Sequence, residues 1–167
     1  VLHDAPDSLV ERQLAGIQEW EDIEQRRITD ADLPATTRTA LVKARVGQGL
    51  FKERVSHLER ACRITFVDNP AHLIGSHIKP WRECSNEERL DGTNGLLLTP
   101  SVDHLFDRGF ISFDDNGELL VSRVADLRSL KRMGVDPDLP PRPQSFNGDQ
   151  RHFLDFHRRE VFLGAGY

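Results

Sequence analysis

The chain has 167 residues, of which 38% are hydrophobic and 29% are charged, and its formal net charge is −5. This length suits one domain with its own core, and no apolar run approaches the ~20 residues that a membrane-spanning helix needs. The two cysteines, Cys62 and Cys84, form no CxxC pair, which argues against a disulfide framework and against a four-cysteine zinc site. We therefore expect a cytoplasmic protein with no membrane partner.

The negative charge is concentrated toward the N-terminal end. Residues 1–32 carry nine acids and three arginines, whereas residues 38–63 carry seven lysines or arginines and two glutamates. A local basic segment is compatible with DNA binding, because phosphate contacts depend on local rather than net charge. A solvated helix face is the simpler explanation of the charges alone.

The N-terminal segment predicts an amphipathic helix. A capping box at Ser8–Glu11 is followed by apolar residues at helical spacing as far as about Arg27. The chain begins at Val1 rather than at Met, so we expect a fragment of a longer protein. Residues 1–34 are accordingly predicted to be an acidic helix and linker to an upstream module, and residues 35–167 to be the folded domain.

Two further helices are predicted after the break at Pro34. Thr36 or Thr37 can begin a short helix that runs through Val46. Gly47 and Gly49 are expected to interrupt it. A third helix is then predicted over residues 50–58, with apolar residues on one side and basic residues on the others.

The middle of the chain predicts two strands and a loop. Apolar and polar side chains alternate in residues 62–67, and several of these residues are β-branched, which favours a strand. Residues 68–70 are expected to form a turn. Residues 73–78 predict a second strand, which Pro80 ends. A second capping box, Ser85–Glu88, predicts a short helix within the loop that follows.

The C-terminal half predicts a helix, a hairpin and two more helices. Pro100 suits the first turn of a helix over residues 101–108, and Gly109 suits the position just after its end. A turn at Asn116-Gly117 predicts a hairpin between residues 110–113 and 118–122. The last two predicted helices cover 126–133 and 150–162, with Phe153, Phe156 and Phe162 inward, Arg151, Arg158 and Arg159 outward, and His157 on the helix surface.

The segment from Gly75 to Asp107 contains residue types that hydrolysis of a phosphodiester needs. A histidine can take a proton from water at neutral pH, and carboxylates bind Mg²⁺ or Mn²⁺ through oxygen. Asp103 and Asp107 lie one helical turn apart, and His104 is three residues before Asp107, so either pair could hold a divalent cation. An asparagine cannot act as a base, but its amide can orient an imidazole or ligate a metal.

Four motifs in this chain resemble the HNH endonuclease family: S-H-I-K-P-W, N-G-L-L-L, D-H-L-F-D and G-F-I-S-F. The resemblance runs from about Arg45 to the F-H-R-R-E-V-F element near the C-terminus. It implies an α+β fold with a ββα-metal core, additional flanking helices, and a C-terminal β-hairpin and helix.

The resemblance also implies roles for individual residues. His77 would be the general base, and Asn94 would pin the loop and orient the histidine. Asp103 is the expected ligand of one Mg²⁺ or Mn²⁺ ion, with Asp107 in support and His104 as the ligand if the helix is rotated by one residue. Ser76 stands where many members have an Asp or His ligand, so the metal would be held weakly or completed by water and phosphate.

Candidate contacts to double-stranded DNA lie around this segment. They are Lys79, Arg82, Arg45, Gln48, Arg54 and Arg158. Contacts to the phosphate backbone carry no sequence information, so we expect low intrinsic sequence specificity.

The expected function is a metal-dependent DNA endonuclease domain, the effector of a restriction or phage-defence protein, with an upstream sensor or specificity domain in the same chain. A homodimer would provide the two active sites that a double-strand break requires. The alternative is a non-catalytic DNA-binding or assembly module that retains the HNH fold. Its motivation is Ser76 together with Asp103, which stands where the family has its last metal-ligand histidine. A structural zinc domain is a third option, against which the sparse cysteines argue.

Overall fold

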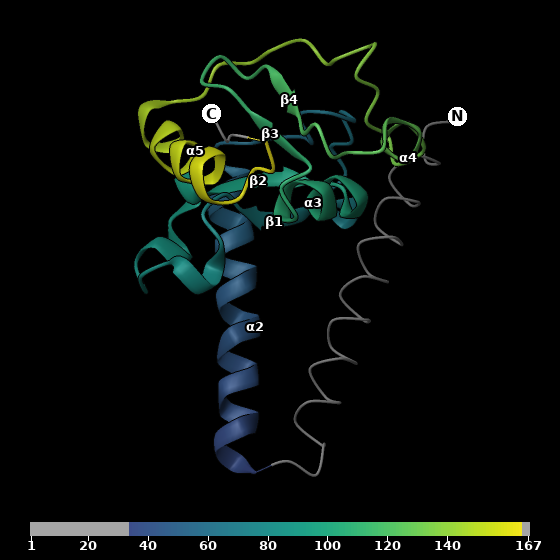
Figure 1. The fold of residues 1–167 in the computed structure, drawn as a ribbon. Helices are drawn as coiled ribbons and strands as arrows, with labels where there is room; N and C mark the ends of the chain where they lie inside the picture. The colour runs from purple at the N-terminus through teal and green to yellow at the C-terminus, as the bar shows by residue number, and fades with distance from the viewer. Residues whose placement is uncertain (1–33, 165–167) are drawn as a thin grey trace, which may run out of the picture. The chain divides into compact units, whose positions relative to one another are not determined.

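The computed structural model describes residues 34–164 (Figure 1). The chain divides into two compact units, residues 1–47 and 48–167. The predicted helix from Ser8 to Arg27 and the predicted link to an upstream module lie outside the described residues. No helix between residues 34 and 164 is both long and apolar enough to cross a bilayer.

A single helix, α2, runs from Ala35 to Ser56. The predicted interruption at Gly47 and Gly49 is therefore wrong. A glycine in a helix costs about 1 kcal/mol relative to alanine, which weakens a helix without requiring it to end. The C-terminal turns of α2 are anchored by Phe51 and Val55, whose side chains are completely buried.

Residues 62–67 form a turn rather than the predicted strand. The amide of Cys62 donates to the carbonyl of Val67 and the amide of Phe66 donates to the carbonyl of Cys62, both at 2.9 Å. Phe66 has a φ of 60°, outside the β region. The alternation that suggested a strand arises because Cys62 and Ile64 insert into the core while Phe66 stays exposed.

Two antiparallel hairpins follow. Strand β1 (Ile74–His77) pairs with β2 (Gly95–Leu98) so that Ser76 lies opposite Leu96 and His77 opposite Gly95. Strands β3 (Ile111–Phe113) and β4 (Leu119–Val121) form the second hairpin. The predicted strand at residues 73–78 and the predicted hairpin at 110–122 are confirmed.

The helices in the C-terminal half agree with their predicted positions. Helix α3 spans Pro100–Asp107 and is followed, after its cap at Arg108, by Gly109, whose φ of 77° favours glycine. Helix α4 spans Leu127–Arg132, and α5 spans Gly148–Glu160 with a capping box between Asn147 and Gln150. Short 3₁₀ turns occupy Pro70–His72, Trp81–Glu83, Glu88–Leu90 and Gly92–Asn94.

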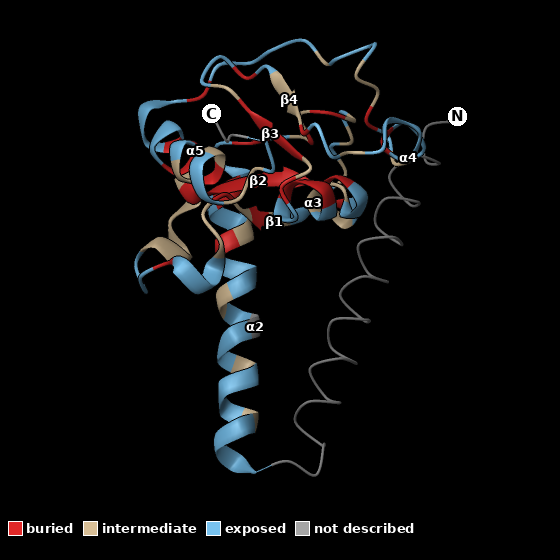
Figure 2. Ribbon diagram, viewed as in Figure 1, coloured by how far each residue is buried: buried red, intermediate tan, exposed pale blue. Residues whose placement is uncertain are grey.

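The first hairpin and α3 form the ββα unit on which the motif residues lie. Helix α3 packs against β1 and β2, and α5 packs against β3. Buried residues gather on β2, β3 and the inner side of α3 (Figure 2). The α+β class with a ββα core, flanking helices and a C-terminal hairpin and helix is thus confirmed.

The predicted surface position of His157 is wrong. The residue is 1% exposed, and its ring stacks on Phe106 of α3 with centroids 3.9 Å apart. Nε2 lies 2.9 Å from the carbonyl oxygen of Phe106, and Nδ1 lies 2.9 Å from the hydroxyl of Ser112 on β3. The neighbouring arginines suggested a solvated face, but the imidazole connects α5 to both α3 and the second hairpin.

Of the three phenylalanines predicted to face inward on the last helix, Phe153 is buried and Phe156 is half-buried, whereas Phe162 is half-buried and lies beyond the end of α5. Arg151 and Arg159 are exposed as predicted, whereas Arg158 is half-buried. Its guanidinium donates to the carbonyl of Phe113 and to Asp115, so it fastens α5 to the second hairpin.

Candidate active site

His77 ends strand β1 with its ring held on two sides. The imidazole stacks on Phe51 of α2, with ring centroids 3.7 Å apart and planes 4° apart. Nε2 lies 2.9 Å from the backbone carbonyl oxygen of Arg89. A carbonyl can only accept, so Nε2 carries the proton and Nδ1 of the neutral ring has a free electron pair.

Burial lowers the pKa of His77 below its ordinary value, and it outweighs the hydrogen bond to Arg89, which acts in the opposite direction. The positive charge of Arg89 lowers this pKa further. The ring is therefore neutral at pH 7, the state in which it can accept a proton.

The opposite strand leaves room for this arrangement at Gly95. A Cβ atom there would lie 2.2 Å from a methyl carbon of Val55 and 2.7 Å from the ring of Phe51. Both contacts are far inside van der Waals distance. Glycine opposite His77 is what allows the end of α2 to approach the hairpin.

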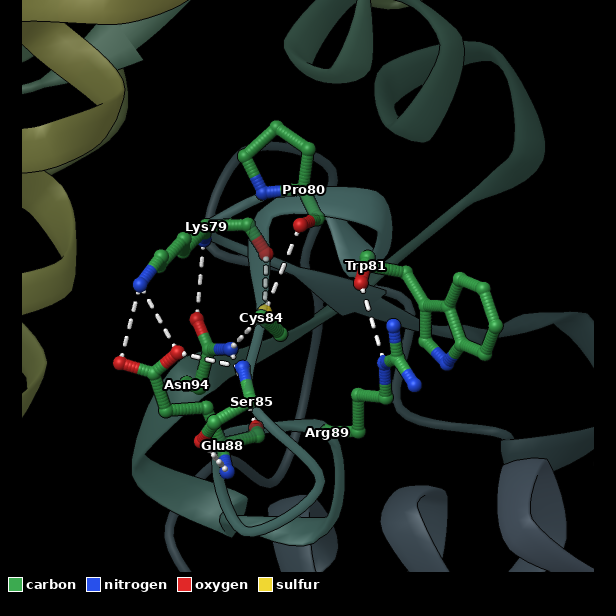
Figure 3. Close-up of polar contacts among 8 residues, drawn as sticks. All are labelled: Lys79, Pro80, Trp81, Cys84, Ser85, Glu88, Arg89 and Asn94. Atoms are coloured by element: carbon green, nitrogen blue, oxygen red, sulfur yellow. Dashed lines mark hydrogen bonds and ion pairs between the residues drawn. The ribbon is translucent and has the colours of Figure 1, made fainter.

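Asn94 is completely buried at the base of the loop between β1 and β2 (Figure 3). Its side-chain oxygen accepts from the amide of Lys79 at 2.9 Å, and its side-chain nitrogen donates to the carbonyl of Glu88 at 3.1 Å. It also donates to the sulfur of Cys84 at 3.2 Å. Asn94 does not hydrogen-bond to His77 itself; it holds the peptide next to the Arg89 carbonyl that accepts from the imidazole.

Three other side chains, which the sequence analysis did not identify, complete this loop. The Cys84 thiol contacts the carbonyls of Lys79 and Pro80 at 3.2 and 3.4 Å, and burial raises its pKa, so the thiol stays protonated and can donate. The carboxylate of Glu88 accepts from the Lys79 ammonium at 2.8 and 3.0 Å, which lowers the pKa of Glu88. The Arg89 guanidinium stacks on Trp81.

Of these loop contacts, the sequence predicted only the Ser85–Glu88 capping box. Both of its reciprocal hydrogen bonds are present in the structure.

Asp103 lies on α3 facing β1. It is half-buried, and the Ser76 hydroxyl hydrogen-bonds to its carboxylate. Burial raises the pKa of Asp103, and the negative charge of Asp107 raises it further, while the bond from Ser76 and the charge of His104 lower it. Asp107 and His104 are exposed.

The oxygen donors near Asp103 suit a hard divalent cation in type but are few. Within residues 34–164, no group of three or more His, Cys, Asp or Glu side chains is arranged to hold a metal ion. Mg²⁺ commonly binds through one or two carboxylates and keeps several waters, so Asp103 with Asp107 fits that ion. Both cysteines are free and buried, and they offer no zinc site.

The candidate DNA contacts fall into two groups. Lys79, Arg54 and Arg158 already have partners: Glu88, the carbonyl of Leu90, and the hairpin residues Phe113 and Asp115. The side chain of Arg82 is 83% exposed, and among residues 34–164 its one charged contact is with Glu83 at 3.5 Å; Gln48 is exposed. The side chain of Arg45 lies outside the described part.

One comparison with known proteins matches the part of the chain that carries these residues. Residues 62–114 match a family model described as HNH endonuclease, a segment that contains β1, the loop, β2 and α3. No curated protein matches the chain. Residues 62–114 are thus similar to the HNH endonuclease family, whose members are nucleases that act on DNA.

Proposed function

We propose that this protein is a metal-dependent DNA endonuclease that hydrolyses phosphodiester bonds with His77 as the general base. The observation that carries the proposal is the pair of contacts on the His77 ring. With Nε2 directed to the Arg89 carbonyl, Nδ1 is the nitrogen that can take a proton from a water molecule. The same carbonyl stabilises the imidazolium that forms, because its oxygen faces the positive ring.

Asn94 supports the proposal as a positioning residue. Asn94 stands at the end of the loop and bonds to Lys79 at its start and to Glu88 within it, so the Arg89 carbonyl stays in place when the imidazole changes charge. A buried amide with several partners is rigid, and rigidity keeps the base in a productive geometry.

Asp103, with Asp107 in support, would hold one Mg²⁺ or Mn²⁺ ion. The ionised form of Asp103 is disfavoured by burial and by Asp107, and a cation would reverse both effects. His104 remains the alternative ligand. When bound, such an ion supplies electrostatic stabilisation of the charge that develops on the scissile phosphate.

Lys79 is left out of the proposed DNA contacts because its ammonium is paired with Glu88. Arg82, Gln48 and Arg54 are the proposed contacts that are exposed, with Arg45 and Arg158 as further candidates. All of these would contact phosphate, so we propose low intrinsic sequence specificity. Targeting would then come from a sensor or specificity domain upstream, as in a restriction or phage-defence protein. A homodimer would bring two such sites to opposite strands.

The test is nicking of a supercoiled plasmid by the purified chain with Mg²⁺, with Mn²⁺ and with EDTA. We expect nicking with either ion and none with EDTA. His77→Ala should abolish it, whereas His72→Ala, a matched exposed histidine just before β1, should retain the rate. Nicking by His77→Ala at the wild-type rate would refute the assignment of the base.

A non-catalytic DNA-binding or assembly module is the second candidate. The small number of metal donors near Asp103, with Ser76 in place of a ligand, favours it. Plasmid binding without nicking in either metal would support this candidate. Retention of the same affinity by Asp103→Asn would further show that binding needs no ion at this carboxylate.

A further inference from the structure

A cleft of about 600 Å³ opens beside the candidate active site. Its walls come from three segments: the turn that begins at Pro80, the end of α3 at Asp107 and Arg108, and the end of α5 at Glu160 and Val161. This volume is in the range of sites that bind small molecules or single nucleotides. Asp107 lies one turn of α3 from Asp103, and its charge raises the pKa of Asp103. The cleft therefore adjoins the proposed metal carboxylates.

Trp81 lines the cleft with a half-exposed indole. The Arg89 guanidinium carbon lies 3.8 Å from the centroid of the ring, and Arg89 Nε donates to the Trp81 carbonyl at 3.2 Å. Figure 3 shows this pair on the opposite side of the loop from Lys79 and Glu88. The indole is thus fixed from one side but remains 50% exposed, which is unusual for a tryptophan whose role is packing alone.

Two arginines line the cleft with Trp81. Arg82 is 83% exposed in its side chain, and its contact with Glu83 is long at 3.5 Å. Arg108 is exposed, and its guanidinium forms no hydrogen bond or ion pair with any residue in the range 34–164. Asp107 and Glu160 lie in the same walls, so the cleft is not uniformly positive and would accept a phosphate only near the arginines.

An aromatic platform with nearby arginines is the chemistry that binds a nucleotide of a single strand. Bases stack on aromatic side chains, and arginines contact the phosphate backbone. A base in an intact duplex has both faces covered by its neighbours, so it cannot stack on Trp81 without leaving the helix.

We propose that this cleft receives an unpaired nucleotide of a DNA strand, with its base on Trp81 and its phosphate near Arg82 and Arg108. The inference rests on the proposed function and specifies its substrate class: DNA with a single-stranded segment, such as a gap or an overhang, next to the scissile phosphate. Trp81 is a binding residue in this proposal and takes no part in proton transfer.

The chain offers a direct optical test because it contains only two tryptophans, Trp20 and Trp81. A Trp20→Phe, His77→Ala variant of the full chain reports on Trp81 alone and does not cut. We expect its fluorescence to be quenched by a short single-stranded oligonucleotide and by a gapped duplex. The intact duplex of the same sequence should quench it at much higher concentration only.

The matched variants separate stacking from packing. In the same background, affinity for a labelled single strand should fall roughly 5- to 100-fold with Trp81→Leu and change little with Trp81→Phe, which keeps an aromatic face. Arg82→Gln should reduce the slope of log affinity against log salt by about one. Circular dichroism checks that each variant is folded.

The proposal is overturned if single strands leave the fluorescence unchanged, if the intact duplex quenches equally well, or if Trp81→Leu binds as tightly as the parent. These results do not depend on cleavage. Plasmid nicking without quenching would refute this inference alone, whereas quenching without nicking in Mg²⁺ or Mn²⁺ would refute the proposed activity alone.

Discussion

The imidazole of His77 lies parallel to the phenyl ring of Phe51, with centroids 3.7 Å apart. Phe51 is completely buried and covers one face of the ring, so it contributes to the burial that lowers the pKa of His77. A base with a lowered pKa stays neutral as the solution becomes more acidic. Nicking should therefore decline with falling pH only below the ordinary histidine value of about 6.5.

Phe51→Leu should move this acid limb upward, toward pH 6.5, because a smaller side chain admits water to the ring. The measurement is the rate of plasmid nicking between pH 5 and 8 at saturating Mg²⁺. Phe113→Leu is the matched control, since Phe113 is also buried but lies on β3 in the second hairpin. An identical shift in both variants would mean that general destabilisation, and not the stack, moves the limb.

Asn94→Ala should lower both stability and activity. The substitution leaves the amide of Lys79 and the carbonyl of Glu88 without their partner, at about 1–3 kcal/mol for each buried group. We expect the free energy of unfolding to fall by roughly 2–6 kcal/mol and the nicking rate to fall at least about tenfold. Urea unfolding and plasmid assays measure the two effects.

Asn116→Ala, at the exposed turn of the second hairpin, is the control for Asn94 and should change neither quantity. Wild-type stability in Asn94→Ala would show that the buried bonds contribute little.

Lys79 should contribute to the loop and not to DNA affinity, because its ammonium is paired with Glu88. Lys79→Gln and Glu88→Gln should each destabilise by about 1 kcal/mol, and the double variant should lose less than the sum. The salt dependence of DNA binding should be the same in Lys79→Gln as in the wild type. A slope reduced by about one would instead identify Lys79 as a phosphate contact.

His157 makes stability depend on pH. Burial lowers the pKa of His157 to about 4, well below the ordinary value of 6.5. Between these two values the unfolded chain is protonated at this residue and the folded protein is not, so stability falls as the pH falls from about 6.5 to about 4. The loss over the whole window is about 3 kcal/mol.

His157→Gln keeps a donor directed at the Phe106 carbonyl but cannot titrate. Its unfolding free energy should therefore depend less on pH in this window than that of the wild type. Equal slopes in the two proteins would show that His157 is not the titrating group. His77, whose pKa is also lowered by burial, contributes in the same direction in both.

Two glycine substitutions should have opposite effects. Gly95→Ala places a methyl group 2.2 Å from Val55, so it should destabilise strongly and displace His77 from Phe51. At Gly49, within α2, nothing lies within 4 Å of the added carbon, and alanine should stabilise the helix by roughly 0.5–1 kcal/mol. Thermal unfolding of both variants tests the pair, and a stable, active Gly95→Ala would contradict the close approach.

The order of residues along the chain by itself determined the motif, strand β1, the second hairpin and helix α3. These features depend on local rules: alternation in a strand, the Asn-Gly turn, proline in the first turn and glycine after the last. The Ser85–Glu88 capping box likewise needs only neighbours, and it is present. The same local rules overestimated the helix-breaking effect of Gly47 and Gly49, because a helix anchored by buried residues tolerates glycine.

Only the tertiary structure decided what surrounds the candidate base. Phe51 comes before His77 in the chain and Arg89 comes after it, yet both contact the ring. The contact from Arg89 is made by its backbone carbonyl, which every residue has, so no residue type in the sequence predicts it. His157 is buried because α3 and the second hairpin close over it, although its neighbours are arginines. Contacts between distant segments depend on how the elements pack, and packing is not encoded in local periodicity.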